Sequence, residues 1–344
     1  MLPRDGTTRP SSLYNAEMET LRGTGPLPKK PNLVAIVGPT GSGKSALALD
    51  LAARFQGEVV NCDSIQIYRY FDIGAAKVPE EERRDIPHHM IGVANPDEVF
   101  TAGDFAHLAR PILRDIAGRG RLPLVTGGTG FYLRALVEGL APGPARDEAL
   151  RAALQAREAR RRGCAHRLLR RLDPLTALRI HPNDLPKVIR ALEICVSARR
   201  SATEVFAEGR NALEGFSVLK IGIFPDREKL YERLASRMEA MFAAGLIEET
   251  ASILARGYTT GCKAFESIGY KQALQSINGE LSPKDALFYA TRETRRYAKR
   301  QMTWFRQEPG LEAVSGFGDD PRVAARVDER IRAFLAAASD TRHD

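Results

Sequence analysis

Several residue types and patterns are scarce in this chain of 344 residues. It has four cysteines and none forms a C-x-x-C pair, so we expect neither a zinc site nor a disulfide scaffold, and such sparse thiols are typical of a reducing cytoplasm. No uninterrupted apolar stretch approaches the roughly 18 residues of a membrane-spanning helix. The apolar core of a secretory signal is missing too. These absences favour a soluble, cytoplasmic protein with no membrane partner.

The composition is that of an ordinary globular protein. Hydrophobic residues make up 43% and charged residues 27% of the sequence, which excludes a largely disordered chain. The length allows two or three domains, each with its own core. Residues 1–31 differ from the rest because they contain five prolines and no apolar periodicity. We therefore expect a disordered tail at residues 1–31.

Charge is unevenly distributed along the chain. Residues 32–139 hold 11 Lys and Arg against 13 Asp and Glu, whereas residues 140–344 hold 35 against 27. A near-neutral first part joined to a basic second part favours a polyanionic partner that meets the second part. A solvated, arginine-rich helical surface would give the same counts. Charge alone does not separate these two interpretations.

From residue 32 onward the pattern predicts an α/β fold. Leu33–Val37 is an apolar run with the length of one buried strand, and Ser45–Phe55 has helical spacing. Glu58–Cys62 and Arg121–Thr126 read as further strands, and a helical pattern follows through residues 131–137. Strands that alternate with helices indicate an open, mostly parallel sheet. Ligands of such sheets bind outside the carboxyl ends of the strands.

A helical block interrupts this alternation. Residues 146–208 have helical spacing almost throughout, and Ser217–Phe224 restores a strand-like run. We therefore predict a catalytic core formed by residues 32–140 and 217–315, with an all-helical domain inserted at 141–216. Residues 316–344 are predicted to form a C-terminal helix and tail.

The segment G-P-T-G-S-G-K-S fits the phosphate-binding pattern G-x-x-x-x-G-K-[ST], and it has the required strand before it and helix after it. Its glycines let successive backbone N–H groups point into one concavity, and the helix N-terminus adds partial positive charge. The lysine would neutralise phosphate oxygens and the last serine would hold Mg²⁺. The predicted diphosphate or nucleotide site is therefore Gly38, Pro39, Thr40, Gly41, Ser42, Gly43, Lys44 and Ser45, with Ser45 as the metal ligand.

The acidic residue that usually accompanies such a loop is missing from its usual place. The strand ending at Thr126 is followed by Gly127-Gly128-Thr129, without the aspartate that holds Mg²⁺ in nucleotide hydrolases. An acid instead follows the second strand, at Asp63, where sheet topology places it facing the phosphate loop. Asp63 read on its own could also be a helix N-cap or a magnesium ligand.

At this point the chain resembles a known family, the tRNA dimethylallyltransferases, or tRNA isopentenyltransferases, over about residues 32–310. The content, order and spacing of nine segments carry the resemblance: GPTGSGKS (38–45), NCDSIQIYRYFDIGAAK (61–77), PHHMIG (87–92), VFTAGDF (99–105), LPLVTGGTGFYLRALVEGL (122–140), HPNDLPKVIRALE (181–193), PDREKLYERLASRM (225–238), ESIGYK (266–271) and TRRYAKRQMTWFR (294–306). The chain departs from the family at Gly92, where an aspartate is usual, so any role for that acid is in doubt here.

The resemblance implies both a fold and a reaction. The fold is a P-loop NTPase-like core with an inserted helical domain that grips the anticodon stem-loop of tRNA. The reaction transfers a dimethylallyl group from dimethylallyl diphosphate to N6 of adenosine 37, beside the anticodon, and releases diphosphate. No phosphoryl group moves in this reaction, which explains the missing acid. Mg²⁺ is the expected cofactor, and we expect a monomer.

The resemblance also implies roles for three residues. Asp63 would be the general base that removes the N6 proton, which typically contributes about 10²–10⁴-fold. Thr129 would lie by the bridging oxygen and the adenine, although a helix cap for residues 130–137 is the alternative. Arg237 matches the second arginine of an R-x-x-x-R pattern and would bind the diphosphate, although a surface ion pair is the alternative.

A larger set of residues is expected to bind tRNA: Asp63, Ser64, Ile65, Gln66, Arg151, Pro186, Lys187, Val188, Ile189, Arg190, Glu266, Ser267, Ile268, Gly269, Tyr270 and Lys271. Two arginine-rich segments, residues 151–171 and 292–306, would meet phosphates. The adjacent His88 and His89 cannot both face one metal from a regular element, so we interpret them as structural.

Three alternatives stay open. An adenylate isopentenyltransferase would act on a free nucleotide, but the helical insertion and its arginines argue against it, because AMP needs no such platform. A P-loop small-molecule kinase would use Asp63 to activate a hydroxyl. A non-enzymatic nucleic-acid-binding module would not need the phosphate loop.

Overall fold

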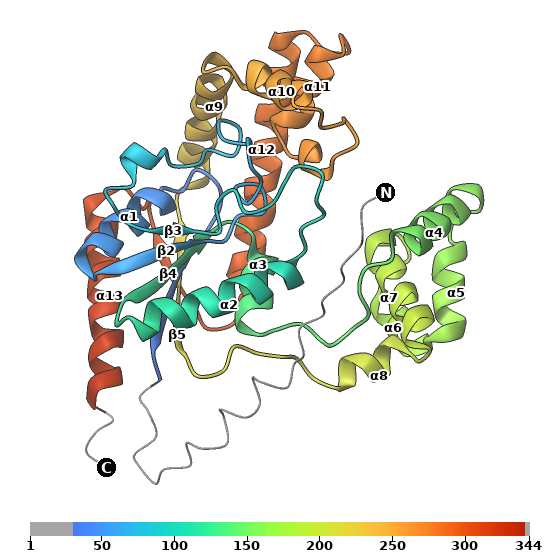
Figure 1. Cartoon of the computed structure of the whole chain (residues 1–344), viewed down its shortest axis with the longest axis horizontal. Coiled ribbons are helices and arrows are strands. Elements are labelled where there is room, and N and C mark those ends of the chain that lie inside the picture. Colours follow the sequence, from blue (N-terminus) through green and yellow to red (C-terminus); the bar gives the residue numbers. More distant parts are fainter. Residues whose placement is uncertain (1–29, 341–344) are drawn as a thin grey trace, which may run out of the picture. The chain divides into compact units, whose positions relative to one another are not determined.

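The computed structural model describes residues 30–340 and has a six-stranded parallel sheet at its centre (Figure 1). The strand order is β3-β2-β4-β1-β5-β6, and every neighbouring pair is parallel. The strands are β1 (Asn32–Val37), β2 (Gly57–Asn61), β3 (His88–His89), β4 (Leu122–Gly127), β5 (Ser217–Phe224) and β6 (Leu311–Ser315). The predicted α/β fold class is confirmed.

Helices cover both faces of the sheet because the central strands alternate buried side chains between two cores. On one face Val34 and Ile36 pack with α1 (Lys44–Arg54) and α13 (Pro321–Asp340). On the other face Leu33, Ala35 and Val37 pack with α2 (Ala102–Gly118) and α3 (Gly130–Val137). A capping box begins α2, since Thr101 accepts from the Asp104 amide and the Asp104 carboxylate accepts from the Thr101 amide.

Five helices lie between α3 and β5: α4 (Glu148–Arg160), α5 (Cys164–Leu172), α6 (Pro174–Arg179), α7 (Leu185–Ala198) and α8 (Ala202–Ala207). They share an apolar cluster of their own, as the helical spacing predicts. The two connecting segments run together, because the Leu213 amide donates to the Val137 carbonyl and the Asn211 amide to the Leu140 carbonyl. Chain contacts nevertheless group everything from Pro31 onward into one unit.

Four further helices follow β5: α9 (Arg227–Ala243), α10 (Leu246–Ala255), α11 (Tyr270–Ile277) and α12 (Pro283–Arg306). Two short 3₁₀ turns, η1 (Glu80–Glu82) and η2 (Lys263–Glu266), complete the elements. Leu246, Phe265 and Tyr270 pack against Ile67 and Phe71, so they fix the long loop that follows β2. No helix among residues 30–340 is long and apolar enough to cross a membrane.

The C-terminal segment adds an edge strand and a covering helix to the sheet. Residues 311–315 form an edge strand paired with β5, and α13 buries Val323, Val327 and Ile331 against the sheet. The segment after residue 315 is therefore part of the sheet's core layer. The predicted tail at residues 1–31 lies almost wholly outside the described residues.

Candidate active site

The phosphate loop joins β1 to α1. Gly41 and Gly43 adopt φ of 77° and 82°, the left-handed region that favours glycine. A Cβ at Gly43 would lie 2.5 Å from a carboxylate oxygen of Asp319, so that position has no room for a side chain. Lys44 is buried, and its Nζ donates to the Pro39 carbonyl at 2.7 Å. The loop has the form that binds phosphate groups.

A cavity of about 590 Å³ opens at this loop. It is cationic on one side, since Lys44 and the α9 residues Arg233 and Arg237 all line it. Burial lowers the pKa of Lys44 to about 7, Asp63 raises it in part and Arg237 lowers it further. An anion bound here would restore the charged form of Lys44. This cavity fits a diphosphate.

Arg237 is the cation best placed to meet a ligand. Burial first, then the neighbouring Arg233, lowers the pKa of Arg237, whereas Asp63 raises it. Among the described residues Arg237 makes no hydrogen bond and no ion pair, so the alternative of a surface ion pair for it is wrong. Arg233 differs, because Asp319 holds its guanidinium with two hydrogen bonds.

Asp63 lies just beyond the carboxyl end of β2, as sheet topology predicts. Its Oδ1 accepts from the amides of Ile65 at 2.9 Å and Gln66 at 3.4 Å, which fixes the carboxylate against the turn that follows. Among residues 30–340 its other oxygen, Oδ2, has no hydrogen-bond partner. One oxygen of the Asp63 side chain therefore makes a contact like that of a helix cap, and the other oxygen stays available to accept a proton.

A second cavity, of about 290 Å³, adjoins the first. Four residues line both cavities, namely Thr40, Asp63, Ala75 and Arg237. The second cavity has apolar walls, in part from α9, and polar groups from α12, as follows: Ile65, Leu234, Met238, Met241, Ile268, Thr294, Tyr297 and Arg300. Burial and the Asp63 charge raise the pKa of Tyr297 above its usual range, so its hydroxyl stays protonated.

Thr129 lies beside this junction without lining either cavity. Its Oγ1 accepts from the Ser64 amide at 3.0 Å and donates to the Ser64 Oγ at 3.3 Å. Thr129 occupies the N-cap position of α3, but its side chain makes no capping hydrogen bond to that helix. Thr129 instead supports the backbone next to Asp63.

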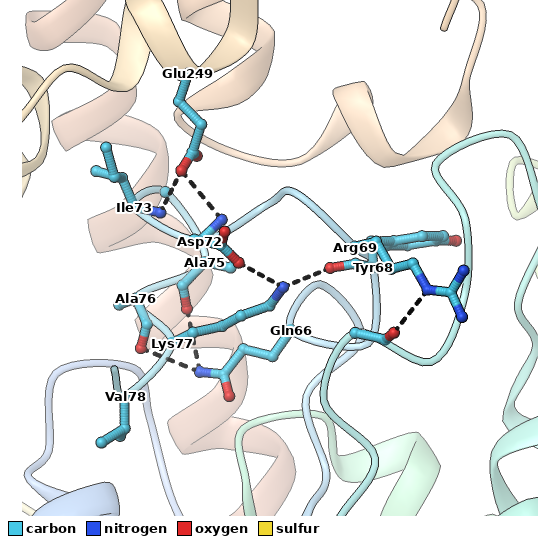
Figure 2. A network of polar contacts seen from close by, with 12 residues as sticks. Gln66, Tyr68, Arg69, Asp72, Ile73, Ala75, Ala76, Lys77, Val78 and Glu249 are labelled. Carbon is cyan, nitrogen blue, oxygen red and sulfur yellow. Dashed lines mark hydrogen bonds and ion pairs between the residues drawn. The ribbon is translucent and has the colours of Figure 1, made fainter. Parts of the chain in front are cut away.

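The loop at residues 66–78 lines the first cavity and, at Gly74 and Ala75, the second cavity. A network of polar contacts fixes this loop (Figure 2). The Gln66 Nε2 donates to the Ala75 and Ala76 carbonyls at 3.1 and 3.3 Å. Lys77 Nζ donates to the Tyr68 carbonyl and the Asp72 carboxylate. From α10, a Glu249 oxygen accepts from the amides of residues 72 and 73. The side-chain nitrogen of Gln66 thus donates its hydrogen bonds within the loop itself.

Three of the residues expected to bind tRNA have buried side chains. Val188 and Ile189 belong to the apolar cluster of the inserted helices, and Tyr270 is buried under the 66–78 loop. The prediction that these side chains contact RNA directly is therefore wrong. The apolar periodicity that indicates a helix also places these side chains on its inward-facing side. The sequence segment is exposed instead at Pro186 and Lys187.

Arg151 and Arg190 have a partner within the protein. Both guanidinium groups bind the carboxylate of Glu193, which is fully buried, and Arg151 does so at 2.8 Å to each oxygen. Burial alone would raise the pKa of Glu193, but the bonds from Arg151, from Arg190 and from the Asp147 amide outweigh it and lower the pKa to about 2. The Arg151 pair joins α4 to α7, whereas Arg190 lies on α7 together with Glu193 and also donates to the Pro144 carbonyl.

The first part of the segment at residues 266–271 lines the second cavity. Glu266, Ser267 and Ile268 line that cavity and Lys271 is exposed, whereas Gly269 has a left-handed φ of 93° at the start of α11. The Tyr270 hydroxyl donates to Glu249 and accepts from the Gly74 amide. Tyr270 thus acts on the site through the 66–78 loop.

Sequence reasoning missed three residues of the site. Gln301 of α12 bridges the phosphate loop and β4, since its Oε1 accepts from the Thr40 amide and its Nε2 donates to the Gly128 carbonyl. Arg233 lines the first cavity, and its place one helical turn before Arg237 was the available signal. Thr126 also lines this cavity, with a buried hydroxyl that has no hydrogen-bond partner among residues 30–340.

Few side chains at the site could bind a metal ion. Among residues 30–340 no group of three or more His, Cys, Asp and Glu side chains could enclose a metal ion. Ser45 is exposed and lines the first cavity, so one hydroxyl is available beside the phosphate loop. Mg²⁺ bound mainly by phosphate oxygens and water fits such a donor set. His88 and His89 instead bind the Ile86 carbonyl and the Glu58 carboxylate.

The cavity at the phosphate loop and the second, partly apolar cavity share one carboxylate on their walls. Such a site defines an enzyme of the P-loop fold class that joins a phosphate-bearing substrate to a second substrate. A family model described as IPP transferase matches residues 66–308. The tRNA dimethylallyltransferase of Solibacter usitatus is 57% identical over 303 residues, which cover 88% of this chain and 99% of that protein. The chain belongs to this family, the tRNA dimethylallyltransferases.

Other relatives and solved structures agree. The tRNA dimethylallyltransferase of Koribacter versatilis is 48% identical and covers 88% of this chain and 98% of its own length. The tRNA isopentenylpyrophosphate transferase of Bacillus halodurans has a TM-score of 0.68 at 36% identity, covering 92% of this chain and all of that one. A eukaryotic dimethylallyltransferase acting on tRNA has a TM-score of 0.76 at 27% identity, covering 89% and 80%.

Proposed function

We propose that this protein transfers a dimethylallyl group from dimethylallyl diphosphate to N6 of adenosine 37 in tRNA and releases diphosphate. One observation carries the proposal: Asp63 and Arg237 line both the cationic cavity at the phosphate loop and the adjoining, partly apolar cavity. A proton acceptor and a diphosphate-binding cation thus stand where two substrates would meet.

The donor is assigned to the larger cavity. Backbone amides of the phosphate loop, Lys44 and Arg237 would hold the diphosphate, and they stabilise the negative charge that grows on it as the allylic C1–O bond breaks. The low pKa of Lys44 reflects its burial, and diphosphate supplies the counter-charge that the free protein lacks there. The dimethylallyl group would extend toward Asp63.

Mg²⁺ is the proposed cofactor, and Ser45 is the residue that would hold it. When bound, the ion supplies additional positive charge to the diphosphate. The buried Thr126 hydroxyl on the wall of the same cavity has no partner within the described part of the chain, and it is suited to receive a hydrogen bond from water there. The remaining ligands would be phosphate oxygens and water.

The acceptor adenine is assigned to the smaller cavity. As the N6–C1 bond forms and the C1–O bond breaks, the N6 proton passes to the free Oδ2 of Asp63. The amides of Ile65 and Gln66 hold the carboxylate in place during this step. Adenine reaches this position only if it leaves the stack of the anticodon loop. We assign the exposed residues of the inserted helices, Pro186 and Lys187 among them, to the anticodon stem.

Product formation with labelled dimethylallyl diphosphate tests the proposal. The protein is incubated with the labelled donor and either an anticodon stem-loop containing adenosine 37, or AMP. A parallel reaction contains ATP and candidate alcohols. Label in the stem-loop, on N6 of the expected adenosine, is the expected result. Label in AMP alone would identify an adenylate isopentenyltransferase, and phosphorylated alcohol would identify a kinase.

A further inference from the structure

Tyr70 has a backbone conformation that its side chain disfavours. Its φ is 69°, in the left-handed region, although it is neither glycine nor asparagine. The conformation is held from both sides, because Tyr68, two residues before Tyr70, and Phe71, directly after it, are buried in the apolar cluster under the 66–78 loop. Tyr70 itself remains 36% exposed. A strained residue that keeps a large aromatic ring at the surface is a candidate for function.

The ring of Tyr70 lies beside one cation and one tilted aromatic ring. The Arg256 guanidinium, at the end of α10, lies 4.5 Å from the ring centroid. The Tyr258 ring, two residues further on, lies 6.0 Å away at an angle of 41°. These three side chains, Tyr70, Arg256 and Tyr258, are called the Tyr70 stack below. They come from two segments of the chain that meet at the surface.

The charge around the Tyr70 stack favours an anionic partner. Among residues 30–340, neither Arg256 nor the adjacent Arg69 forms an ion pair with a carboxylate. Within the described residues Arg69 donates only to the Gly92 carbonyl and the Asn95 side chain (Figure 2 shows the first of these contacts). Asp97 is the acidic residue whose charge also reaches Tyr258. Two unpaired guanidinium groups beside two aromatic rings match a nucleotide, which offers a phosphate and a flat base together.

We propose that the Tyr70 stack binds a base of the anticodon loop next to the adenosine that is modified. The inference rests on the proposed function, in which the target adenine leaves the loop and its neighbours lose a stacking partner. Tyr70 is well placed for such a neighbour, because it belongs to the same loop whose Gly74 and Ala75 line the second cavity. The Tyr70 ring replaces the lost stacking, while Arg69 and Arg256 meet the backbone phosphates.

Substitution of Tyr70 tests the proposal without disturbing the fold. Tyr70→Gly removes the ring and suits the left-handed φ, so its melting temperature should not fall below that of the wild type. Tyr70→Phe keeps the ring. Leu108→Ala is the control, since Leu108 is a large apolar side chain, 43% exposed, on α2 and lines neither cavity of the site. Binding of an anticodon stem-loop is measured for each variant.

We expect Tyr70→Gly to raise the stem-loop Kd about ten-fold, the usual effect of losing one stacked base. Tyr70→Phe and Leu108→Ala should stay within about two-fold. Two stem-loops with 2-aminopurine on the 5′ or the 3′ side of the target adenosine locate the contact at saturating protein. The wild type should quench one of them, and Tyr70→Gly should restore its fluorescence.

The outcomes separate the two proposals. An unchanged Kd and unchanged quenching in Tyr70→Gly, together with label transfer by the wild type, would overturn the Tyr70 stack alone. Failure of the wild type to prenylate the stem-loop would overturn the proposed function and the stack with it. Loss of affinity in Tyr70→Phe equal to that in Tyr70→Gly would assign the contact to the hydroxyl and reject stacking.

Discussion

Arg233 and Asp319, 86 residues apart in sequence, form two parallel hydrogen bonds of 2.9 and 2.7 Å that tie α9 to the segment after β6. The same segment touches the phosphate loop, because the Gly318 amide donates to the Ser42 carbonyl at 2.8 Å. The pair is about 40% exposed on each side. An ion pair this exposed adds little to the free energy of unfolding. Its structural effect is to fix two walls of one cavity relative to each other.

Asp319→Ala should therefore raise the KM for dimethylallyl diphosphate several-fold, because Arg233 loses its anchor beside the diphosphate. The free energy of unfolding should change by less than about 1 kcal/mol. Glu312→Ala is the matched control, since it removes an exposed ion pair with Arg330 away from the cavity. Steady-state kinetics and thermal melts of both variants measure the difference. Equal KM values in the two variants would contradict the assignment.

Asp63→Asn should preserve the fold and the affinity for tRNA but remove the proton acceptor. We expect kcat to fall about 10²-fold or more with little change in KM, because the lost interaction acts in the transition state. Single-turnover transfer to a stem-loop measures this effect. Turnover close to that of the wild type would exclude Asp63 as the base.

Lys44 should make donor binding depend on pH. Its pKa in the free protein is about 7, below the ordinary 10.5, so it loses its proton as the pH rises through 7. Diphosphate favours the charged form, and binding near pH 8 should take up a proton that Lys44→Ala does not take up. Calorimetry in two buffers of different ionisation enthalpy, with wild type and variant, reports that difference. The variant should also bind the donor at least about ten-fold more weakly, while its Kd for tRNA hardly moves.

Glu193 should control the stability of the inserted helices. Its pKa is depressed to about 2, so its contribution is present above the ordinary value of 4.5 and is lost as the pH falls from there toward 2. Glu193→Gln leaves Arg151 and Arg190 short of a counter-charge and should cost about 3 kcal/mol at pH 7. Glu208→Gln, which breaks an exposed pair with Arg200, should cost less than about 1 kcal/mol. Urea unfolding at pH 7 and pH 3 compares them.

Exposed arginines of the insertion should determine how salt affects RNA binding. Arg160 and Arg171 are exposed, and neither has a carboxylate partner among the described residues. With three to five phosphate contacts, log K against log salt should have a slope of about −3 to −4. The double variant Arg160→Gln/Arg171→Gln should reduce its magnitude by roughly two. Arg322→Gln/Arg330→Gln on α13 removes equal charge and should leave the slope unchanged.

The parts of the fold and site that the sequence predicts share a physical cause. Gly38–Ser45 is recognisable because phosphate binding needs glycines and a lysine at fixed spacing, and Asp63 follows because parallel strands end at one edge. Short or edge strands are different: β3 has two residues, and in β6 only Val314 is buried. Neither carries enough apolar pattern to be detected.

Contacts between residues far apart in the sequence could not be predicted from the sequence either. The arginine counts of the insertion do not show that Arg151 and Arg190 share one buried carboxylate. Nor does a helical pattern show that Gln301 bridges the phosphate loop and β4. Such contacts depend on tertiary structure, and a single sequence records only the residue types.

The contact between Gly318 and Ser42 has a consequence for synthesis of the protein. The phosphate loop emerges from the ribosome among the first residues of the fold, yet its strand β1 must wait for both neighbours, β4 and β5. Residues 316–320, which contact the loop, and α13 are translated only after all six strands of the described sheet. A nascent chain therefore carries the complete phosphate-loop sequence long before it can bind a ligand with it. Messages truncated before residue 311 would yield chains that contain nearly every family motif and lack the wall on which the loop rests.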